Sequence, residues 1–135
     1  MPTQHINPTG LLKFDSLSQV VVATGTRTVY IAGQSACNEH FEVIGVGDYY
    51  AQSVQALNNL RIAVEAAGGT AAQIVSSTIY LKNLTPEAGE RFIEAFATAL
   101  GGGPFPNHAF SMIGVQALAS ADALVEISAV AVLDT

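Results

Sequence analysis

The stretch DALVEISAVAVL, residues 122–133, is predicted to be a β-strand because it is β-branched and apolar almost throughout. Glu126 stands in its middle, and burying an ionised carboxylate without a partner is costly. On strict alternation, its side of the strand also carries Leu124, Ser128, Val130 and Val132. These are not the neighbours of a solvated face. Two interpretations remain open: a carboxylate hydrogen-bonded to backbone or to another subunit, and a catalytic acid or base.

Upstream of this stretch, strand-like and helical patterns alternate. The strand-like runs are residues 18–24, 27–33, 73–82 and 108–118. Turn residues Gly25 and Thr26 predict a hairpin between the first two runs. The short connection 119–122 predicts a second hairpin, between residues 108–118 and the final strand. Residues 1–16 carry two prolines and are predicted to form an extended lead-in.

Two helices are predicted between these strands. The first begins after Asp48, a suitable N-cap residue, and ends at Gly68. The second begins at the Thr85-Pro86 pair and ends before Gly101. The order β-β-α-β-α-β-β predicts a two-layer α+β fold in which both helices cover one face of a mixed sheet. We interpret residues 1–135 as a single domain.

The composition points to an oligomer. Half of the residues are hydrophobic and only 12% are charged, which is well below the usual charged share. The helices can cover only one face of the sheet, although its second face is also rich in Val, Ile and Ala. We therefore expect another subunit to cover that second face.

The charge pattern restricts the possible partners. The net charge is −6, and the five basic residues are scattered singly. Because nucleic acids and anionic membranes attract clustered cations, neither is an expected partner. No apolar run reaches the roughly 20 residues of a membrane span, and residues 1–10 do not resemble a signal peptide. The single cysteine, Cys37, excludes an intrachain disulfide and fits a cytoplasmic location.

Several common catalytic and ligand-binding motifs are absent from the sequence. His5, His40 and His108 lack the spacing of metal ligands, so no metal site is expected. No Ser/His/Asp arrangement can be picked out. The glycine-rich run at 101–106 follows a helix and lacks the Lys-Ser/Thr of a phosphate-binding loop, so it is interpreted as a turn.

Three stretches, taken in order, resemble the RidA/YjgF family, also called endoribonuclease L-PSP-like. They are VYIAGQ (29–34), residues 51–81 with the spacing of Gln52, Gln55 and Asn59, and residues 113–133 with the motif V-E-I-x-A-x-A. The resemblance implies a chorismate-mutase-like fold and a homotrimer with a small-molecule cleft between subunits. It also implies hydrolysis of reactive imines and enamines to a ketone and ammonia, without a metal or organic cofactor.

The resemblance also suggests site residues. Glu126 matches the glutamate that activates water. In the family's deaminases, an Arg in a P-A-R-S/T motif grips the substrate carboxylate, and counting back from Ile113 puts Phe110 at this position. Because Phe cannot bind a carboxylate, a simple 2-imino acid is not the expected substrate. The other predicted substrate-binding residues are Leu17, Ser111, Met112 and Arg91.

The sequence therefore supports two functions. One is an imine or enamine deaminase acting on a substrate other than a simple 2-imino acid. The other is a non-enzymatic, small-molecule-binding or regulatory trimer, with the ligand held by Phe110, Leu17 and Met112. Nucleic-acid cleavage, credited to some family members, is disfavoured by the acidic charge. A Glu126 carboxylate open to a cavity near Phe110 would favour catalysis, and one sealed among backbone donors would favour a structural role.

Overall fold

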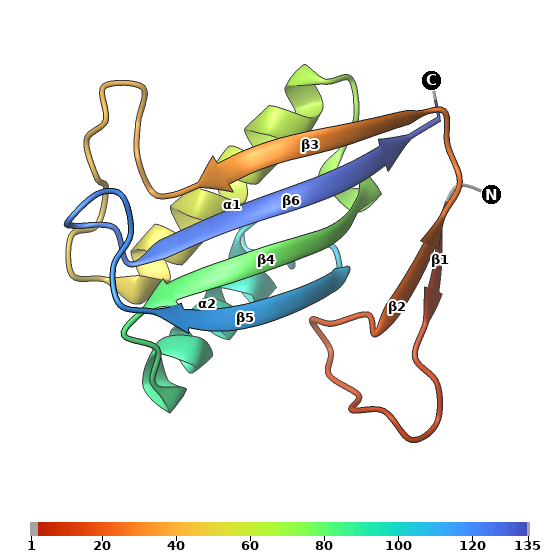
Figure 1. The fold of residues 1–135 in the computed structure, drawn as a ribbon, viewed down its shortest axis with the longest axis horizontal. Coiled ribbons are helices and arrows are strands. Elements are labelled where there is room, and N and C mark those ends of the chain that lie inside the picture. Colours follow the sequence, from red (N-terminus) through yellow and green to blue (C-terminus); the bar gives the residue numbers. More distant parts are fainter. Residues whose placement is uncertain (1–2, 135) are drawn as a thin grey trace.

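The centre of the molecule is a four-stranded mixed sheet with the strand order β3-β6-β4-β5 (Figure 1). The computed structural model describes residues 3–134, and the remaining residues of the predicted lead-in (1–16) and of the predicted domain (1–135) lie outside this range. The strands are β3 (Arg27–Gln34), β4 (Ile74–Lys82), β5 (Ala109–Val115) and β6 (Val125–Leu133). β4 and β5 are parallel, whereas β6 is antiparallel to both of its neighbours.

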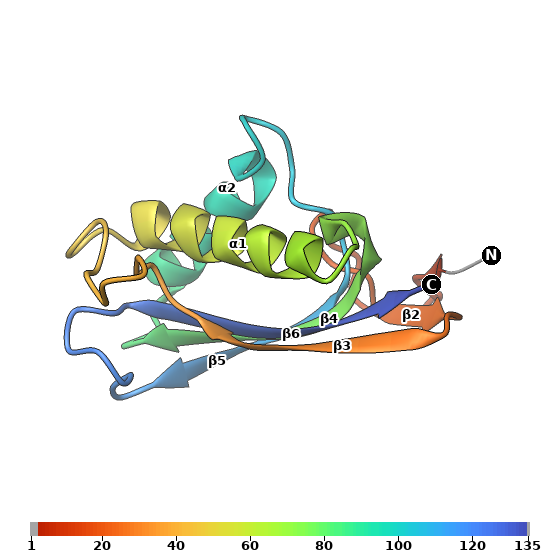
Figure 2. The same cartoon turned by 90° about the horizontal axis from the view of Figure 1, so that it is seen from above.

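Two helices cover one face of this sheet, as predicted (Figure 2). Helix α1 spans Tyr49–Ala66, and the Asp48 side chain accepts a hydrogen bond from the Ala51 N–H. Helix α2 spans Pro86–Thr98, and Thr85 caps it through the Ala88 N–H. The core between helices and sheet includes Leu57, Leu60, Phe92, Phe96, Ile79 and Ile127. A single 3-10 turn, η1 (Ala71–Gln73), leads into β4.

The central strand β6 has the alternation that its sequence predicts. Val125, Ile127 and every second residue onward to Leu133 are buried against the helices. Glu126 and the residues in phase with it are half-buried on the opposite face, where no helix of the described residues lies (Figure 2). We call this second face of the sheet the open face.

The predicted hairpin between residues 18–24 and 27–33 is wrong. β2 (Val20–Ala23) instead pairs with β1 (Thr3–Ile6) in a separate two-stranded sheet beside the main one (Figure 1). The reason lies in the connection, where the Thr26 N–H donates a hydrogen bond to the Leu133 carbonyl at 2.9 Å. Gly25 approaches the same carbonyl so closely that a side chain there would overlap it. This contact with β6 turns the chain from one sheet into the other.

The predicted hairpin between residues 108–118 and the final strand is also wrong. Both segments form strands, but β4 lies between them. Helix α2 connects β4 to β5, and such a crossover sets two parallel strands side by side. β6 consequently pairs with the other edge of β4.

Three buried or half-buried amide side chains of α1 hold the loops at one end of the sheet. Gln52 donates hydrogen bonds to the Gly45 and Asp122 carbonyls, and its oxygen accepts one from the Leu124 N–H. Asn59 donates to the carbonyls of Ser35 and Cys37. Gln55 in turn donates to Asn59. The Gln52–Gln55–Asn59 spacing therefore fixes the loops that flank Glu126.

Candidate functional site

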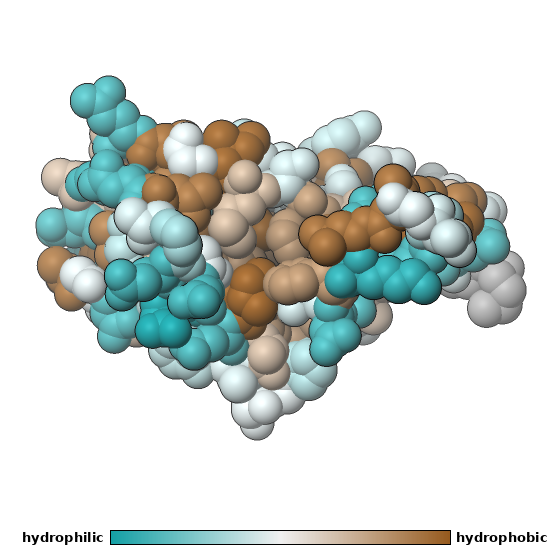
Figure 3. Space-filling view, turned by 90° about the horizontal axis from the view of Figure 1, so that it is seen from below, coloured by the Kyte–Doolittle hydropathy of each residue, from teal (hydrophilic) through white to brown (hydrophobic). Residues whose placement is uncertain are grey.

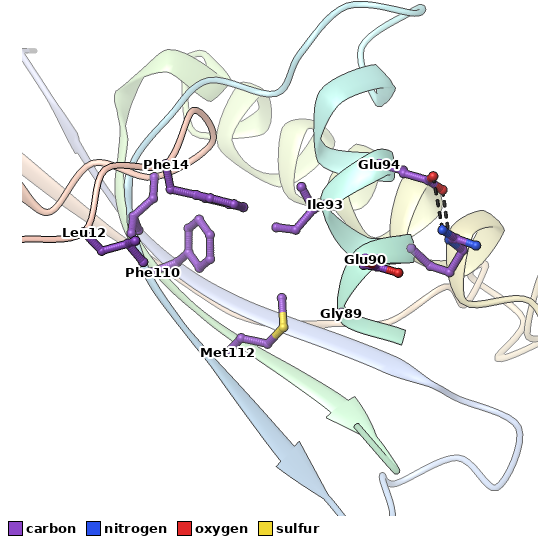
Figure 4. Close-up of a pocket in the computed structure, with 10 residues that line it drawn as sticks. Leu12, Phe14, Gly89, Glu90, Ile93, Glu94, Phe110 and Met112 are labelled. Carbon is purple, nitrogen blue, oxygen red and sulfur yellow. Dashed lines mark hydrogen bonds and ion pairs between the residues drawn. The ribbon is translucent and has the colours of Figure 1, made fainter. Parts of the chain in front are cut away.

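A mostly apolar hollow lies between α2, β5 and the segment that joins β1 to β2. It has a volume of about 670 Å³, and we call it the α2–β5 cavity. Its apolar walls are formed by Leu12, Phe14, Leu17, Ile93, Phe110 and Met112. Four of these side chains, Phe14, Ile93, Phe110 and Met112, point toward a shared space (Figure 4). Apolar residues gather in the middle of this side of the molecule (Figure 3).

Most of the predicted ligand-binding residues meet in this cavity. Leu17, Phe110, Met112 and Arg91 all line it, although they come from three separate parts of the chain. β5 contributes Phe110 and Met112 because its alternate residues face the helices. Such a space, with several apolar walls and few polar groups, is typical of small-molecule sites.

The cation on the rim of the cavity, Arg91, is paired within its own helix. The Arg91 Nε lies 2.9 Å from a Glu94 carboxylate oxygen, and a second hydrogen bond joins the same two side chains (Figure 4). Both side chains are about half exposed. Glu90 also lines the rim. The positive charge of Arg91 is thus neutralised by Glu94 of the same helix, and Arg91 is poorly suited to hold an anionic ligand in the cavity.

Glu126 lies on the open face and does not line the α2–β5 cavity. Its carboxyl group rests against β3, where a methyl group added to Gly33 would overlap it. Within residues 3–134, the carboxylate has no hydrogen-bond or ion-pair partner. It is therefore not sealed among backbone donors.

The open face provides Glu126 with neighbours that the sequence reasoning did not assign to a site. Tyr80 of β4 is its direct partner in the sheet register. Lys82 is two residues further along β4 and therefore on the same face. The alternation of residues 73–82 indicates that Tyr80 and Lys82 lie on the same side of a strand. Only the pairing of β4 with β6 brings these two side chains beside Glu126.

Ser111 does not line the α2–β5 cavity, because the pleat of β5 turns its side chain to the other face of the sheet. It is exposed on the open face, in register with Thr78. It also lines a smaller hollow of about 440 Å³ that Leu17 and Phe110 border from the edge of the sheet. One chain therefore presents an apolar cavity on its helix face and the Glu126 carboxylate on its open face.

His108 forms a buried pair with Ser77 that sequence reasoning also missed. The His108 Nε2 lies 2.8 Å from the Ser77 hydroxyl, and the Nδ1 lies 3.0 Å from the Pro106 carbonyl. A carbonyl can only accept, so Nδ1 carries the proton and Nε2 accepts from Ser77. This is the hydrogen-bond order of a nucleophile and its base. Burial lowers the pKa of His108 to about 4, however, which makes the imidazole a poor base at neutral pH.

The arginine of the P-A-R-S/T motif has no counterpart in either possible register. Counting back from Ile113 aligns it with Phe110, and counting forward from Pro106 aligns it with His108. His108 is buried and enclosed by the rings of Phe96, Phe105 and Phe110. Neither side chain can grip a carboxylate as an arginine does.

Two further features bear on ligands and membranes. Among residues 3–134, no three His, Cys, Asp or Glu side chains are grouped as a metal ion would require. Over the same range, neither helix has the length and apolar character needed to cross a bilayer.

The chain is similar in sequence and structure to proteins of a known family. The family model described as Endoribonuclease L-PSP matches residues 12–133, almost the whole chain. Among solved structures, a protein of unknown function of the conserved Rid family from Yersinia pestis, YyfB, is 36% identical, with a TM-score of 0.86. The match covers 98% of this chain and 100% of that one.

Two further structures have lower identity. RidA from an Antarctic Psychrobacter bacterium is 27% identical with a TM-score of 0.67, covering 90% of this chain and 97% of its own. A member of the YjgF/YER057c/UK114 family from Mycobacterium tuberculosis is 29% identical with a TM-score of 0.61, covering 97% and 99%.

Proposed function

The chain belongs to the endoribonuclease L-PSP family, also named Rid or YjgF, and from this premise we propose that it is a Rid-type imine or enamine deaminase. Its chorismate-mutase-like α+β fold is that of the family. The observation that carries the proposal is the half-buried Glu126 carboxylate, which has no partner among residues 3–134 and lies on a sheet face that no other element of that range covers. A carboxylate in that position is available as an acid or base.

The proposed site is formed between copies of the chain. Glu126 and the α2–β5 cavity lie on opposite faces of one sheet, so a small molecule cannot contact both within a single chain. In a homotrimer, the open face of one copy meets the cavity side of the next. One copy then supplies Glu126 and its neighbour supplies the apolar wall that includes Phe110.

Glu126 performs proton transfer in this reaction. Its carboxylate takes a proton from a water molecule as the water oxygen attacks the carbon of the C=N bond, and the nitrogen gains a proton. In the resulting carbinolamine, the carboxylate takes the hydroxyl proton and the nitrogen gains a proton, so that the C–N bond breaks, ammonia leaves and a ketone forms. An imine and one water thus become a ketone and ammonia, and an enamine enters the same route after tautomerising to the imine.

The preferred substrate differs from a simple 2-imino acid. Phe110 and His108 leave the cavity without the guanidinium that binds an α-carboxylate. Arg91 does not replace it because Glu94 already neutralises its charge. The apolar wall instead favours an imine whose groups next to the C=N carbon are uncharged.

The test measures ammonia release from imines formed in solution. Amino-acid oxidase forms 2-imino acids from amino acids, and an amine oxidase forms neutral imines from primary amines, so neither source adds ammonia to the assay. We expect faster ammonia release from the neutral imines than from 2-iminopropionate, and loss of at least about tenfold in rate for Glu126→Gln. Equal rates for wild type and Glu126→Gln would overturn the role of Glu126.

Mixing two inactive variants tests the shared site. Glu126→Gln keeps the cavity, whereas Gly89→Trp fills it, since a Cβ at Gly89 has only ordinary contacts and the ring extends into the hollow. Each variant alone should be inactive. Co-expression in equal amounts should restore about a quarter of the wild-type activity, because only clefts that combine the two intact halves work. No recovery in verified mixed oligomers would contradict the shared site.

A second candidate function is non-enzymatic binding of an apolar small molecule. The observation in its favour is the α2–β5 cavity itself, whose walls are mostly apolar and whose rim cation, Arg91, is already paired with Glu94. A ligand that protects the protein against thermal unfolding in wild type and Glu126→Gln, but not in Gly89→Trp, without ammonia release, would favour this function.

A further inference from the structure

Within the part of the chain that the structure describes, the open face carries one basic side chain near Glu126, that of Lys82. Tyr80 is paired directly with Glu126, so Lys82, two residues along β4, is the diagonal neighbour of the glutamate on the same face. Diagonal neighbours of this kind are about 7–8 Å apart at their backbones, within reach of long side chains. Lys82 is half-buried at the end of β4.

The Lys82 ammonium is held in place but not neutralised. Its Nζ donates a hydrogen bond to the Ala121 carbonyl at 3.1 Å, in the loop between β5 and β6. An ammonium group has three donors, so two remain. Over residues 3–134, no carboxylate forms an ion pair with it. Glu126 leans toward Gly33 on the opposite side of β6, which leaves the two charges apart.

The other basic side chains lie elsewhere. Arg61 and Arg91 pair with Glu65 and Glu94 on the outer surfaces of their helices. Arg27 faces the helix side of the sheet and donates to the Ala67 carbonyl. Lys13 is exposed in the segment before β2. Lys82 is therefore the basic residue that shares the face of Glu126.

We propose that Lys82 is a specificity-determining residue that binds an anionic group of the substrate, set several bonds away from the carbon that Glu126 serves. This inference rests on the proposed function, because it defines the substrate class of the same site. A carboxylate next to the C=N carbon is too close to that carbon to meet Lys82, since the Glu126 carboxyl lies against Gly33 of β3 whereas the Lys82 ammonium extends to the Ala121 carbonyl. A carboxylate two or three carbons further along the substrate spans the gap.

The test uses stable ketones that resemble the products, so that its result does not depend on turnover. Levulinate carries a carboxylate remote from its ketone, pyruvate carries one beside its ketone, and methyl levulinate carries none. Binding is followed by NMR chemical shifts of the wild-type protein. We expect levulinate to bind at least about tenfold more tightly than either of the other two ketones.

Variants assign this preference to one side chain. Lys82→Met keeps the length and removes the charge, and it should abolish the tighter binding of levulinate while leaving that of methyl levulinate unchanged. Lys82→Arg should retain the preference, and Lys13→Met serves as a matched control that behaves as wild type. Levulinate binding equal in wild type and Lys82→Met, or no levulinate preference in wild type, would overturn the proposal.

Glu126→Gln separates this proposal from the deaminase function. The variant should still bind levulinate, because its Lys82 is intact. If it retains full deaminase activity, the catalytic role of Glu126 fails while the Lys82 anchor stands. If activity is lost in Glu126→Gln and levulinate binding is unaffected by Lys82→Met, the anchor fails while the deaminase function stands.

Discussion

At the scale of single residues, two titratable side chains lie in different environments on the two faces of the sheet. Glu126 is half-buried on the open face, without a partner among residues 3–134. His108 is buried on the helix face, and its two ring nitrogens bond Ser77 and Pro106. The first is available for chemistry, and the second stabilises the start of β5.

His108 should make folding stability depend on pH. Burial lowers its pKa from 6.5 to about 4, the hydrogen bond to Pro106 opposes this shift, and the charge of His5 adds to it. Because the unfolded chain then binds a proton more readily than the folded one, this contribution is complete above pH 6.5 and is lost as the pH falls toward 4. The loss should amount to about 3 kcal/mol.

Urea unfolding of wild type and His108→Gln across this pH range checks the prediction. The glutamine amide can still bond Ser77 but does not titrate here, so the variant should lack this loss of stability. If His108→Gln does not fold, NMR titration of the His108 ring in wild type gives its pKa directly. A ring that titrates near its ordinary pKa would refute the prediction.

At the scale of elements, local signals were sufficient for the helices and insufficient for the strand partners. Asp48 and Thr85 cap α1 and α2 through bonds to residues three positions away, which a sequence shows directly. The partners of β2 and β5 depend on contacts distant in sequence. Two short connections consequently suggested hairpins that the sheet does not contain.

Removal of the Asp48 side chain should destabilise the protein through the loss of one helix-capping hydrogen bond. Asp48→Ala leaves the Ala51 N–H without its acceptor, and we expect a loss of about 1 kcal/mol in the free energy of unfolding. Asp48→Ser should lose only a few tenths of a kcal/mol in the free energy of unfolding, because serine also caps helices well. Chemical denaturation compares the three proteins, and equal losses for Ala and Ser would show that capping is not the cause.

At the scale of the whole molecule, the open face is the surface on which both the expected assembly and the proposed site depend. Tyr30, on β3 opposite Val130, is 81% exposed in the single chain. Ile113 of β5 and Val130 and Val132 of β6 share this face, and no element of residues 3–134 covers it. Another copy covering this face would bury Tyr30 and bring Glu126 to a neighbouring cavity.

Charging the open face should therefore disrupt assembly. We expect Tyr30→Lys to sediment as a smaller species than wild type in analytical ultracentrifugation, because a buried unpaired ammonium is strongly disfavoured. Ile62→Lys on α1, where the native side chain is 55% exposed, is the matched control and should sediment as wild type. A Tyr30→Lys protein with unchanged mass would contradict assembly through this face.

The sequence by itself determined the α+β class, both helices with their caps, and the face of β6 on which Glu126 lies, because periodicity and capping act over a few residues. Through a family resemblance, the sequence also predicted that one ligand site includes Leu17, Phe110, Met112 and Arg91. Only the tertiary structure decided that Phe110 and Glu126 lie on opposite faces and that Lys82 is the diagonal neighbour of Glu126. Both facts follow from which strands pair and in what register. That choice is governed by the α2 crossover and by packing across the whole sheet, which no short stretch encodes.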